Sequence, residues 1–454
     1  MLRSGRVLQP AIAWRWLAFA VLLRVVLSPL QHTWDSQTWW NVAAQLGSES
    51  DPFRAVSLPF DRMRELSDLV RGSGLRQNYE YWAYPPGMLL VWWPIARLWA
   101  LAAGPLPEQF VAPDAFLPLP IPPLLSLGMK LPVIVADVAA ALLVARLAKP
   151  AVGRWYLFNP YVLLCGVWTF DAVMLALSLG GLAAAERRRW ALAGVLLGLG
   201  AAVKFVPALF VVSVVFWAVR QASAPVRSVA ITAVAATLSF LLVCLLWQDG
   251  VRQVLLFHAT RSGGGMSWQG VWGAVAWNLP FADLSPITLY LSAQIGTLTL
   301  GSSLLAATLV AWQRELDLVE TSLVMMLGYL AGSKLVNEVY PLPAVVLAAI
   351  VVSRRPSTEM GLLVLALWAT PLLFSTINVP VWGFLVAPMR AAGFVSVDAI
   401  REFHAGYVQT YRSLSIALAL VGAAFQALCL WAIWQVAPVR AGREVMASRE
   451  GYAA

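Results

Sequence analysis

The sequence predicts an all-α, polytopic membrane protein with about twelve transmembrane helices, because apolar runs of roughly 20 residues recur along it. Of its 454 residues, 60% are hydrophobic and only 12% are charged, and the mean hydropathy is +0.72. A soluble domain would carry about 25% charged residues. Apolar runs recur from residue 11 to residue 436, which leaves no room for a separate soluble domain. Residues 1–454 are therefore expected to form one domain.

The basic residues are distributed as in a membrane protein. The net charge is +9, from 32 basic and 23 acidic residues. The arginines form short clusters between apolar runs, which is typical of cytoplasmic loops, and they do not alternate with aromatic residues as in a nucleic-acid-binding groove. We therefore expect a membrane and no nucleic acid as partner. The cysteines lie in apolar runs without metal-ligand spacing and are expected to be buried.

The arginine clusters also orient the first predicted helices. Arg3 and Arg6 place the N-terminus in the cytoplasm, and an uncleaved helix at about 11–30 then carries Asp35 to the outer side. Residues 31–122 are expected to form an outer loop with an interfacial helix at about 84–103. If that helix crossed the membrane, the arginine cluster at 187–189 would lie outside, against the usual distribution of positive charge.

The remaining helices alternate between the two sides. Several are shorter than the usual spanning length of about 20 residues, and we expect them to meet a water-filled outer cavity. Polar outer loops are expected at about 248–281 and 381–411. The helices are expected at about 124–146, 155–169, 172–186, 190–203, 206–219, 228–247, 284–312, on both sides of a turn at 334–340, at 360–380 and at 413–436.

Polar residues collect at the predicted outer ends of these helices. Ionisable groups near a membrane are costly and usually face an interior cavity. Asp35 could act as a general base or could cap the helix that follows it. Lys204 could bind a phosphate or could extend from a helix end towards the membrane surface. Inside the spans, Arg24 and Asp137 are expected to form a buried structural pair.

Two further groups lie in outer loops. His258 and Arg261 lead into a glycine-rich loop, which could present backbone N–H groups to an anion or could be a flexible loop. Lys334, Asn337 and Glu338 lie in the outer turn, where they could bind substrate or could form a local lysine–glutamate pair with a helix cap. The outer polar residues together are Asp35, Asp171, Lys204, His258, Arg261, Lys334, Asn337 and Glu338.

Several segments follow one another in a recognisable order. They are the acid after the first helix, Asp51-Pro-Phe53, Tyr81-Trp-Ala-Tyr-Pro-Pro86, Lys130 to Asp137, Trp155 to Pro160, Gly194 to Gly200, Lys204 to Pro207, His258-x-x-Arg261 and Lys334 to Tyr340. Over about residues 11–350, their order and spacing resemble the GT-C superfamily of polyprenyl-phosphate-sugar-dependent glycosyltransferases. Within it, the chain is similar to the GPI mannosyltransferase I family and its prokaryotic mannosyltransferase relatives.

The resemblance implies an outer loop after the first helix that carries the catalytic acid, here Asp35. That loop often reads Asp-x-Asp in the family, but Asp35-Ser-Gln37 lacks the second acid. We therefore expect no metal cofactor, although dependence on a divalent metal stays open. The resemblance further implies donor-phosphate binding by Lys204, His258, Arg261 and Lys334, and substrate binding by Tyr84, Asn337 and Glu338.

These features together predict an inverting membrane glycosyltransferase, expected to use mannose. It would sit in the cell membrane with its active site on the extracytoplasmic face. It would take a sugar from a polyprenyl-phosphate donor and pass it to a hydroxyl of a glycan, lipid or protein. The alternative is a lipid or polysaccharide transporter or flippase without catalysis, which would be expected to show pseudo-symmetric halves and helices broken at mid-membrane.

The predicted topology can be tested by labelling single cysteines in intact cells. A membrane-impermeant thiol reagent is expected to modify a cysteine placed at position 262 and to spare one at position 188, because positive clusters stay in the cytoplasm. The matched control repeats the labelling after permeabilisation, when both positions should react. Labelling of position 188 alone in intact cells would contradict the orientation.

Overall fold

The computed structural model describes most of the chain between residues 12 and 436. The described ranges are 12–30, 42–44, 46–47, 84–106, 121–248, 251–252, 254–255, 258, 264–271, 274, 285–378 and 383–436. Side chains are not described for some helical residues within them, including 285–293 and 403–413.

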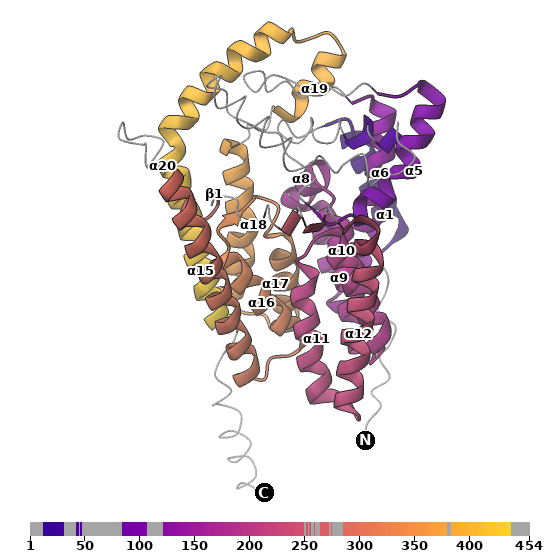
Figure 1. Ribbon diagram of the computed structural model, residues 1–454, viewed down its shortest axis with the longest axis vertical. Helices are drawn as coiled ribbons and strands as arrows, with labels where there is room; N and C mark the ends of the chain where they lie inside the picture. Colours follow the sequence, from indigo (N-terminus) through magenta and orange to yellow (C-terminus); the bar gives the residue numbers. More distant parts are fainter. Residues whose placement is uncertain are drawn as a thin grey trace, which may run out of the picture.

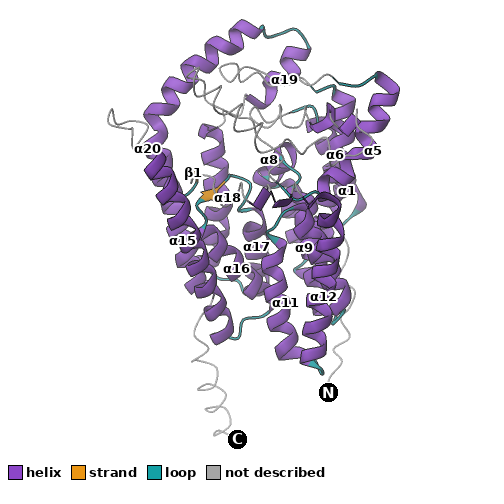
Figure 2. Cartoon of the chain, viewed as in Figure 1, coloured by secondary structure: helices purple, strands orange, loops and turns teal. Residues whose placement is uncertain are grey.

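The described chain is a bundle of helices with one very small sheet (Figures 1 and 2). The helices run mostly along the long axis, with α15, α16 and α20 on one side of the view and α9 to α12 on the other. The elements are α1 (Trp14–Leu27), α5 (Gly87–Ala103), α6 (Pro123–Leu147), α7 (Pro150–Phe158), α8 (Pro160–Trp168), α9 (Asp171–Glu186), α10 (Trp190–Val203), α11 (Pro207–Gln221), α12 (Pro225–Cys244), η1 (Leu245–Trp247), β1 (Gly264–Gly265), α15 (Ser285–Gln313), α16 (Leu318–Gly332), β2 (Leu335–Val336), α17 (Leu342–Arg354), α18 (Thr358–Asn378), α19 (Gly383–Ala391) and α20 (Val397–Val436).

Proline and capping side chains set where several helices begin. Proline is favoured in the first turn because that turn needs no N–H donor, and it opens α6, α7, α8, α11 and α12. The Asn159 side chain caps α8 by accepting hydrogen bonds from the N–H groups of Tyr161 at 2.9 Å and Val162 at 3.3 Å. Asp317 and Glu320 form a capping box at the start of α16.

The length of the helices limits how many can be identified as membrane spans. Among the described residues, five helices are long and apolar enough to cross a membrane, or six if the bent pair α8–α9 is one span. The protein is therefore a membrane protein, but the predicted number of about twelve spans is not confirmed. Five shorter apolar helices, α5, α10, α11, α16 and α17, have 10–17 residues each.

Two predicted boundaries were wrong. The helix predicted at 155–169 is divided at Asn159, whose extended backbone separates α7 from α8, because the following Pro160 disfavours a helical residue before it. The loop predicted at 381–411 contains α19 and the beginning of α20. Its charged residues suggested a loop, but the sequence has no proline between Met389 and Val436 to end a helix. The first predicted helix and the helix at 84–103 correspond to α1 and α5; the interfacial placement of α5 stays a prediction.

The predicted pairing of Arg24 and Asp137 is confirmed. The Arg24 guanidinium forms an ion pair with Asp137, and both side chains are buried. Arg24 also donates to the carbonyl oxygens of Ala20 and Leu157, each at 3.1 Å, and the Tyr156 hydroxyl donates to Asp137. This network fastens α1 to α6 and α7.

Ion pairs and hydrogen bonds gather several helix ends at one end of the bundle, which we term the basic end. Arg354, at the end of α17, pairs with Glu186 at the end of α9 at 2.8 Å and donates to the Leu147 carbonyl at the end of α6. Arg220, at the end of α11, donates to the Leu316 carbonyl just before α16 at 3.1 Å. Since α6, α9, α11 and α17 all end here, each of them begins at the opposite end of the bundle, as an alternating topology requires.

The buried pair predicts a large loss of stability when one partner is removed. Asp137→Asn leaves the Arg24 guanidinium buried without its counter-charge, which is expected to cost about 3–5 kcal/mol. The double variant Arg24→Met/Asp137→Leu should regain most of this loss, because a buried pair replaced by apolar side chains is often nearly neutral. Thermal unfolding in detergent measures both variants.

Glu186→Gln supplies the matched control for this experiment. Its partner Arg354 is partly exposed, so removing the charge is expected to cost about 1 kcal/mol or less. A melting temperature for Asp137→Asn as high as that of Glu186→Gln would contradict a structural role for the Arg24–Asp137 pair.

Candidate active site

Lys204 lies at the end of the bundle opposite the basic end, in the break between α10 and α11. Its Nζ is 2.7 Å from Oδ1 of Asp171, the first residue of α9. The Thr169 hydroxyl donates to Oδ2 of the same carboxylate at 2.5 Å. Both charged side chains are buried, and a buried charge requires such a partner. The pair therefore holds together two helix ends 33 positions apart in the sequence.

Local geometry brings Asp171 to this position. The axes of residues 160–166 and 171–186 are bent by 113°, so α9 begins at the cavity end rather than continuing α8. An acidic residue in the first turn of a helix is favoured by the helix dipole. Pro207 then begins α11 and ends the short segment that carries Lys204. The two charges thus both come from helix ends, where the backbone can turn.

Two aromatic rings confine the lysine ammonium. The Lys204 Nζ lies 4.6 Å from the ring centroid of Tyr340 and 5.3 Å from that of Tyr84, within the range of cation–π attraction. Tyr84 is held because α5 starts directly against the end of α10: a Cβ on Gly87 would be 2.6 Å from the Ala202 carbonyl oxygen. Lys204 is therefore fixed by a carboxylate and by the faces of two rings.

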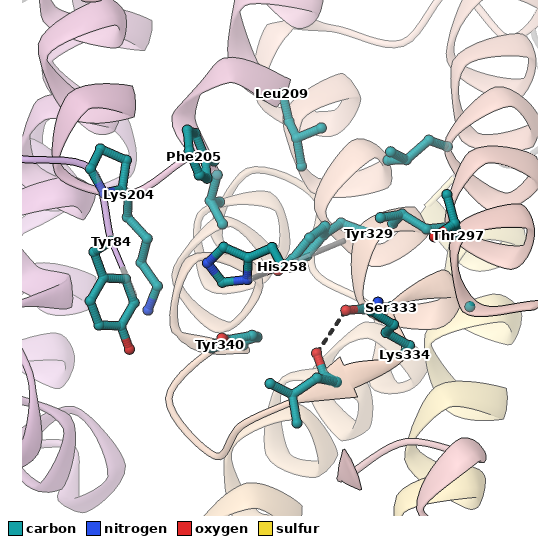
Figure 3. A pocket seen from close by; sticks show the side chains of 16 residues that line it. Tyr84, Lys204, Phe205, Leu209, His258, Thr297, Tyr329, Ser333, Lys334 and Tyr340 are labelled. Carbon is teal, nitrogen blue, oxygen red and sulfur yellow. Dashed lines mark hydrogen bonds between the residues drawn. The ribbon is translucent and has the colours of Figure 1, made fainter. Parts of the chain in front are cut away.

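Lys204 opens onto a cavity of about 310 Å³ (Figure 3). In this view, Tyr84 and Lys204 lie on one side of His258, and Ser333 and Lys334 lie on the other. One part of the wall is polar and another is aliphatic. The lining residues are Tyr84, Pro85, Lys204, Phe205, Val206, Leu209, His258, Gly296, Thr297, Leu300, Leu304, Tyr329, Ser333, Lys334, Leu335 and Tyr340.

Lys334 is positioned by the two-stranded parallel sheet, which pairs Gly264 with Leu335 and Gly265 with Val336. The Met266 N–H donates to the Val336 carbonyl at 2.8 Å, so the glycine-rich loop is joined to the segment after α16. The Ser267 hydroxyl donates to the Lys334 carbonyl at 2.8 Å. These contacts bring two segments about 70 residues apart to one wall of the cavity.

The His258 ring meets the ring of Phe205 edge to face, with the centroids 6.2 Å apart. Phe205 directly follows Lys204, so the histidine reaches the same break between α10 and α11. In Figure 3, His258 lies between Lys204 and Lys334. The cavity thus brings together two lysines and a histidine from three separate segments of the chain.

The structure brings together four of the predicted site residues: Tyr84, Lys204, His258 and Lys334 all line the cavity. Their predicted roles in binding are not tested by this geometry. Asn337 and Glu338 lie in the next turn of the chain; the Asn337 carbonyl accepts from the Tyr340 N–H at 3.0 Å, and the Glu338 carbonyl accepts from the Tyr161 hydroxyl at 2.7 Å. Asp35 and Arg261 lie outside the described residues.

Sequence reasoning missed two members of this site. Asp171 was one of the outer polar residues, but nothing in the sequence paired it with Lys204. Tyr340 lies in the predicted outer turn, where its ring could not be distinguished from the other aromatic residues near the membrane surface. Asp171 begins the second helix of a predicted hairpin, so the sequence places it on the same side of the membrane as Lys204 but does not identify the two as a pair.

The profile of glycosyltransferase family 87 matches residues 82–336, which is more than half of the chain. The chain belongs to glycosyltransferase family 87. Membership, together with the apolar helices, indicates a membrane glycosyltransferase that acts on a sugar donor and an acceptor. A search of curated proteins found no match. The narrower resemblance to the GPI mannosyltransferase I family stays a prediction.

The family 87 match contains the charged part of the cavity. It covers the cavity-lining Tyr84, Lys204, His258 and Lys334, and it also covers Asp171, the partner of Lys204. Asn337, Glu338 and Asp35 lie outside the matched residues. The family assignment therefore rests on the part of the chain that forms the cavity.

The small sheet beside Lys334 yields a prediction for this glycosyltransferase. Gly265 has φ +60°, and a Cβ there would be 2.4 Å from the Val336 carbonyl oxygen. Gly265→Ala should therefore separate the two strands and displace Lys334. A displacement of about 1 Å at an active site can cost on the order of a hundredfold in rate. We expect sugar transfer to fall at least about tenfold in protein that still folds.

Gly104→Ala is the matched control. Gly104 also has a positive φ, +85°, but no atom lies within 4 Å of an added Cβ. It should show the backbone strain without the collision and keep a near-normal transfer rate. Equal rates for the two variants would show that the strand pairing does not position the site.

Proposed function

We propose that the chain transfers mannose from a polyprenyl-phosphate donor to an acceptor hydroxyl on the extracytoplasmic face, with inversion at the sugar. The proposal is carried by one observation: Lys204, His258 and Lys334 line a single cavity together with the aliphatic side chains of Val206, Leu209, Leu300 and Leu304. A phosphate attached to an isoprenoid chain has the same two parts, an anion and a long hydrocarbon. The acceptor would be a glycan, a lipid or a protein.

The aliphatic wall suits the hydrocarbon part of such a donor. Leu300 and Leu304 are four residues apart on α15, so they lie on one face of that helix, and Leu209 belongs to the first turn of α11. These side chains line the same cavity as the charged residues. Burial of an isoprenoid chain against them would be favourable at roughly 25 cal/mol per Å².

The proposed chemistry is a single displacement. The acceptor oxygen bonds to the anomeric carbon as the bond from that carbon to the phosphate oxygen breaks, and the electron pair stays with the phosphate. Asp35 takes the proton of the acceptor hydroxyl. The phosphate thereby gains a negative charge, and cations placed in advance around it stabilise the transition state. Lys204, His258 and Lys334 line the cavity and are proposed to stabilise this charge, together with Arg261.

The proposed orientation follows the distribution of positive charge. The basic end would face the cytoplasm and the cavity would open towards the outside. Counting the short helices α10, α11, α16 and α17 as spans that meet a thinned membrane or a water-filled cavity, with α5 kept at the interface, brings the total towards the about twelve proposed from the sequence. Asn337 and Glu338, next to the cavity-lining Tyr340, are proposed to contact the substrate.

A transporter or flippase without catalysis is the alternative. It would also bind a lipid phosphate, so binding alone does not separate the two. The family 87 match favours transfer. The decisive observation is chemical: an enzyme converts the donor to polyprenyl phosphate, whereas a flippase leaves it intact.

One assay tests the function and the role of Asp35. Purified protein is incubated with labelled polyprenyl-phosphate mannose, or with the glucose analogue, and with a membrane extract as acceptor source. We expect consumption of the mannose donor and release of polyprenyl phosphate. Asp35→Asn should bind the donor but turn over at least about a hundredfold more slowly, because general base catalysis contributes roughly 10²–10⁴-fold.

Asn caps a helix as well as Asp does, so a capping role predicts near-normal turnover for Asp35→Asn. Normal turnover would move the base to Asp51, Glu80 or Glu338. Intact donor after incubation with wild-type protein and acceptor would instead contradict the proposed reaction itself.

A further inference from the structure

Asp171 is paired with Lys204 but does not itself line the cavity. Among the described residues that line the cavity, Lys204 is included and Asp171 is not. Asp171 is 1% exposed and Lys204 is 6% exposed. The carboxylate therefore contacts the ammonium from within the protein, while a ligand would approach it from the cavity.

This arrangement means that Lys204 is already paired with Asp171 before any ligand reaches it. The separation of 2.7 Å is that of a charge-assisted hydrogen bond, which belongs to the strong class. The two charges cancel, so the pair adds no net positive charge to the site. A phosphate that reaches Lys204 must share the ammonium with Asp171.

Hydrogen bonds to Thr169 hold the Asp171 carboxylate next to the Lys204 ammonium, where it would compete with a bound phosphate. The Thr169 hydroxyl donates to Oδ2 at 2.5 Å, and the Asp171 N–H donates to the same hydroxyl oxygen at 3.3 Å. The beginning of α9 favours a negative charge at this residue. The rings of Tyr84 and Tyr340, which line the cavity, also lie against the lysine ammonium.

We propose that Asp171 is a positioning residue that competes with the lipid phosphate for Lys204 and so limits how tightly the product is held. The inference rests on the proposed function. A phosphodiester donor carries one negative charge, and the polyprenyl phosphate released from it carries up to two. A lysine without a counter-ion would bind the more highly charged product most strongly. A resident carboxylate lowers that affinity and allows release, a step that often limits turnover.

The test measures binding of polyprenyl phosphate, without acceptor, to wild-type protein and to Asp171→Asn. The amide keeps the shape of the carboxylate but not its charge. We expect the Kd for polyprenyl phosphate to fall at least about tenfold, since hydrogen bonds to charged partners are strong and one competitor has been removed. In steady state, the variant should show a lower KM for the donor, a lower kcat and stronger inhibition by polyprenyl phosphate.

A purely structural role for Asp171 predicts a different result: less folded protein, with unchanged or weaker product binding for each folded molecule. Asp171→Glu keeps the charge and should stay close to wild type in product inhibition. Glu186→Gln removes a paired carboxylate at the basic end and should change neither the Kd for polyprenyl phosphate nor the inhibition by it. If Asp171→Asn does not fold, Thr169→Val, which releases the carboxylate from its hydroxyl partner, should shift product inhibition in the same direction.

The outcomes distinguish failure of the proposed competition by Asp171 from failure of the proposed function. Wild-type protein that does not bind polyprenyl phosphate would overturn both. If wild-type protein binds polyprenyl phosphate but folded Asp171→Asn shows an unchanged or raised Kd, the competition between Asp171 and the phosphate is overturned and the proposed function is not. Where Asp171→Asn does not fold, the same result for Thr169→Val has the same meaning.

Discussion

The ion pair between Lys204 and Asp171 is the interaction around which the cavity is built. Neither charge could be buried at this place alone, because the cost of burying an isolated charge far exceeds what a single contact recovers. Pairing them requires that α9 begin, and α10 end, at the same point in space. The turns at both helix ends follow from that requirement. The close approach of α5, which the absence of a side chain at Gly87 permits, then brings the Tyr84 ring to the lysine.

The other charged groups follow the same rule of compensation at the two ends of the bundle. At the basic end, Arg354 donates to the Leu147 carbonyl at the end of α6, and Arg220 donates to the carbonyls of Trp312 in the last turn of α15 and Leu316 just before α16. Between the ends, the buried Arg24–Asp137 pair joins α1 to its neighbours. Charge is thus concentrated where it fastens helices together or where it faces the cavity, and the intervening surfaces are apolar, as a membrane requires.

Much of the architecture could be predicted because arginine clusters and proline mark helix ends in the sequence. The helices at 190–203 and 206–219 agree with α10 and α11 within two residues, and Lys204 was correctly placed in the break between them. The pairing with Asp171 could not be predicted, because it depends on the 113° bend before α9, a tertiary feature without a local signal. The error at 397–411 has a different cause: polar composition resembles a loop, but an amphipathic helix can have the same composition.

The central claim is that this cavity holds the phosphate of a lipid-linked donor. An experimental structure with a non-reactive polyprenyl-phosphate sugar analogue tests it most directly. The account predicts the phosphate in the cavity, with at least one of its oxygens within about 3 Å of the Lys204 or Lys334 Nζ, and the first isoprene units against Leu300 and Leu304. A phosphate bound elsewhere, with the cavity occupied only by water or by the acceptor, would contradict it.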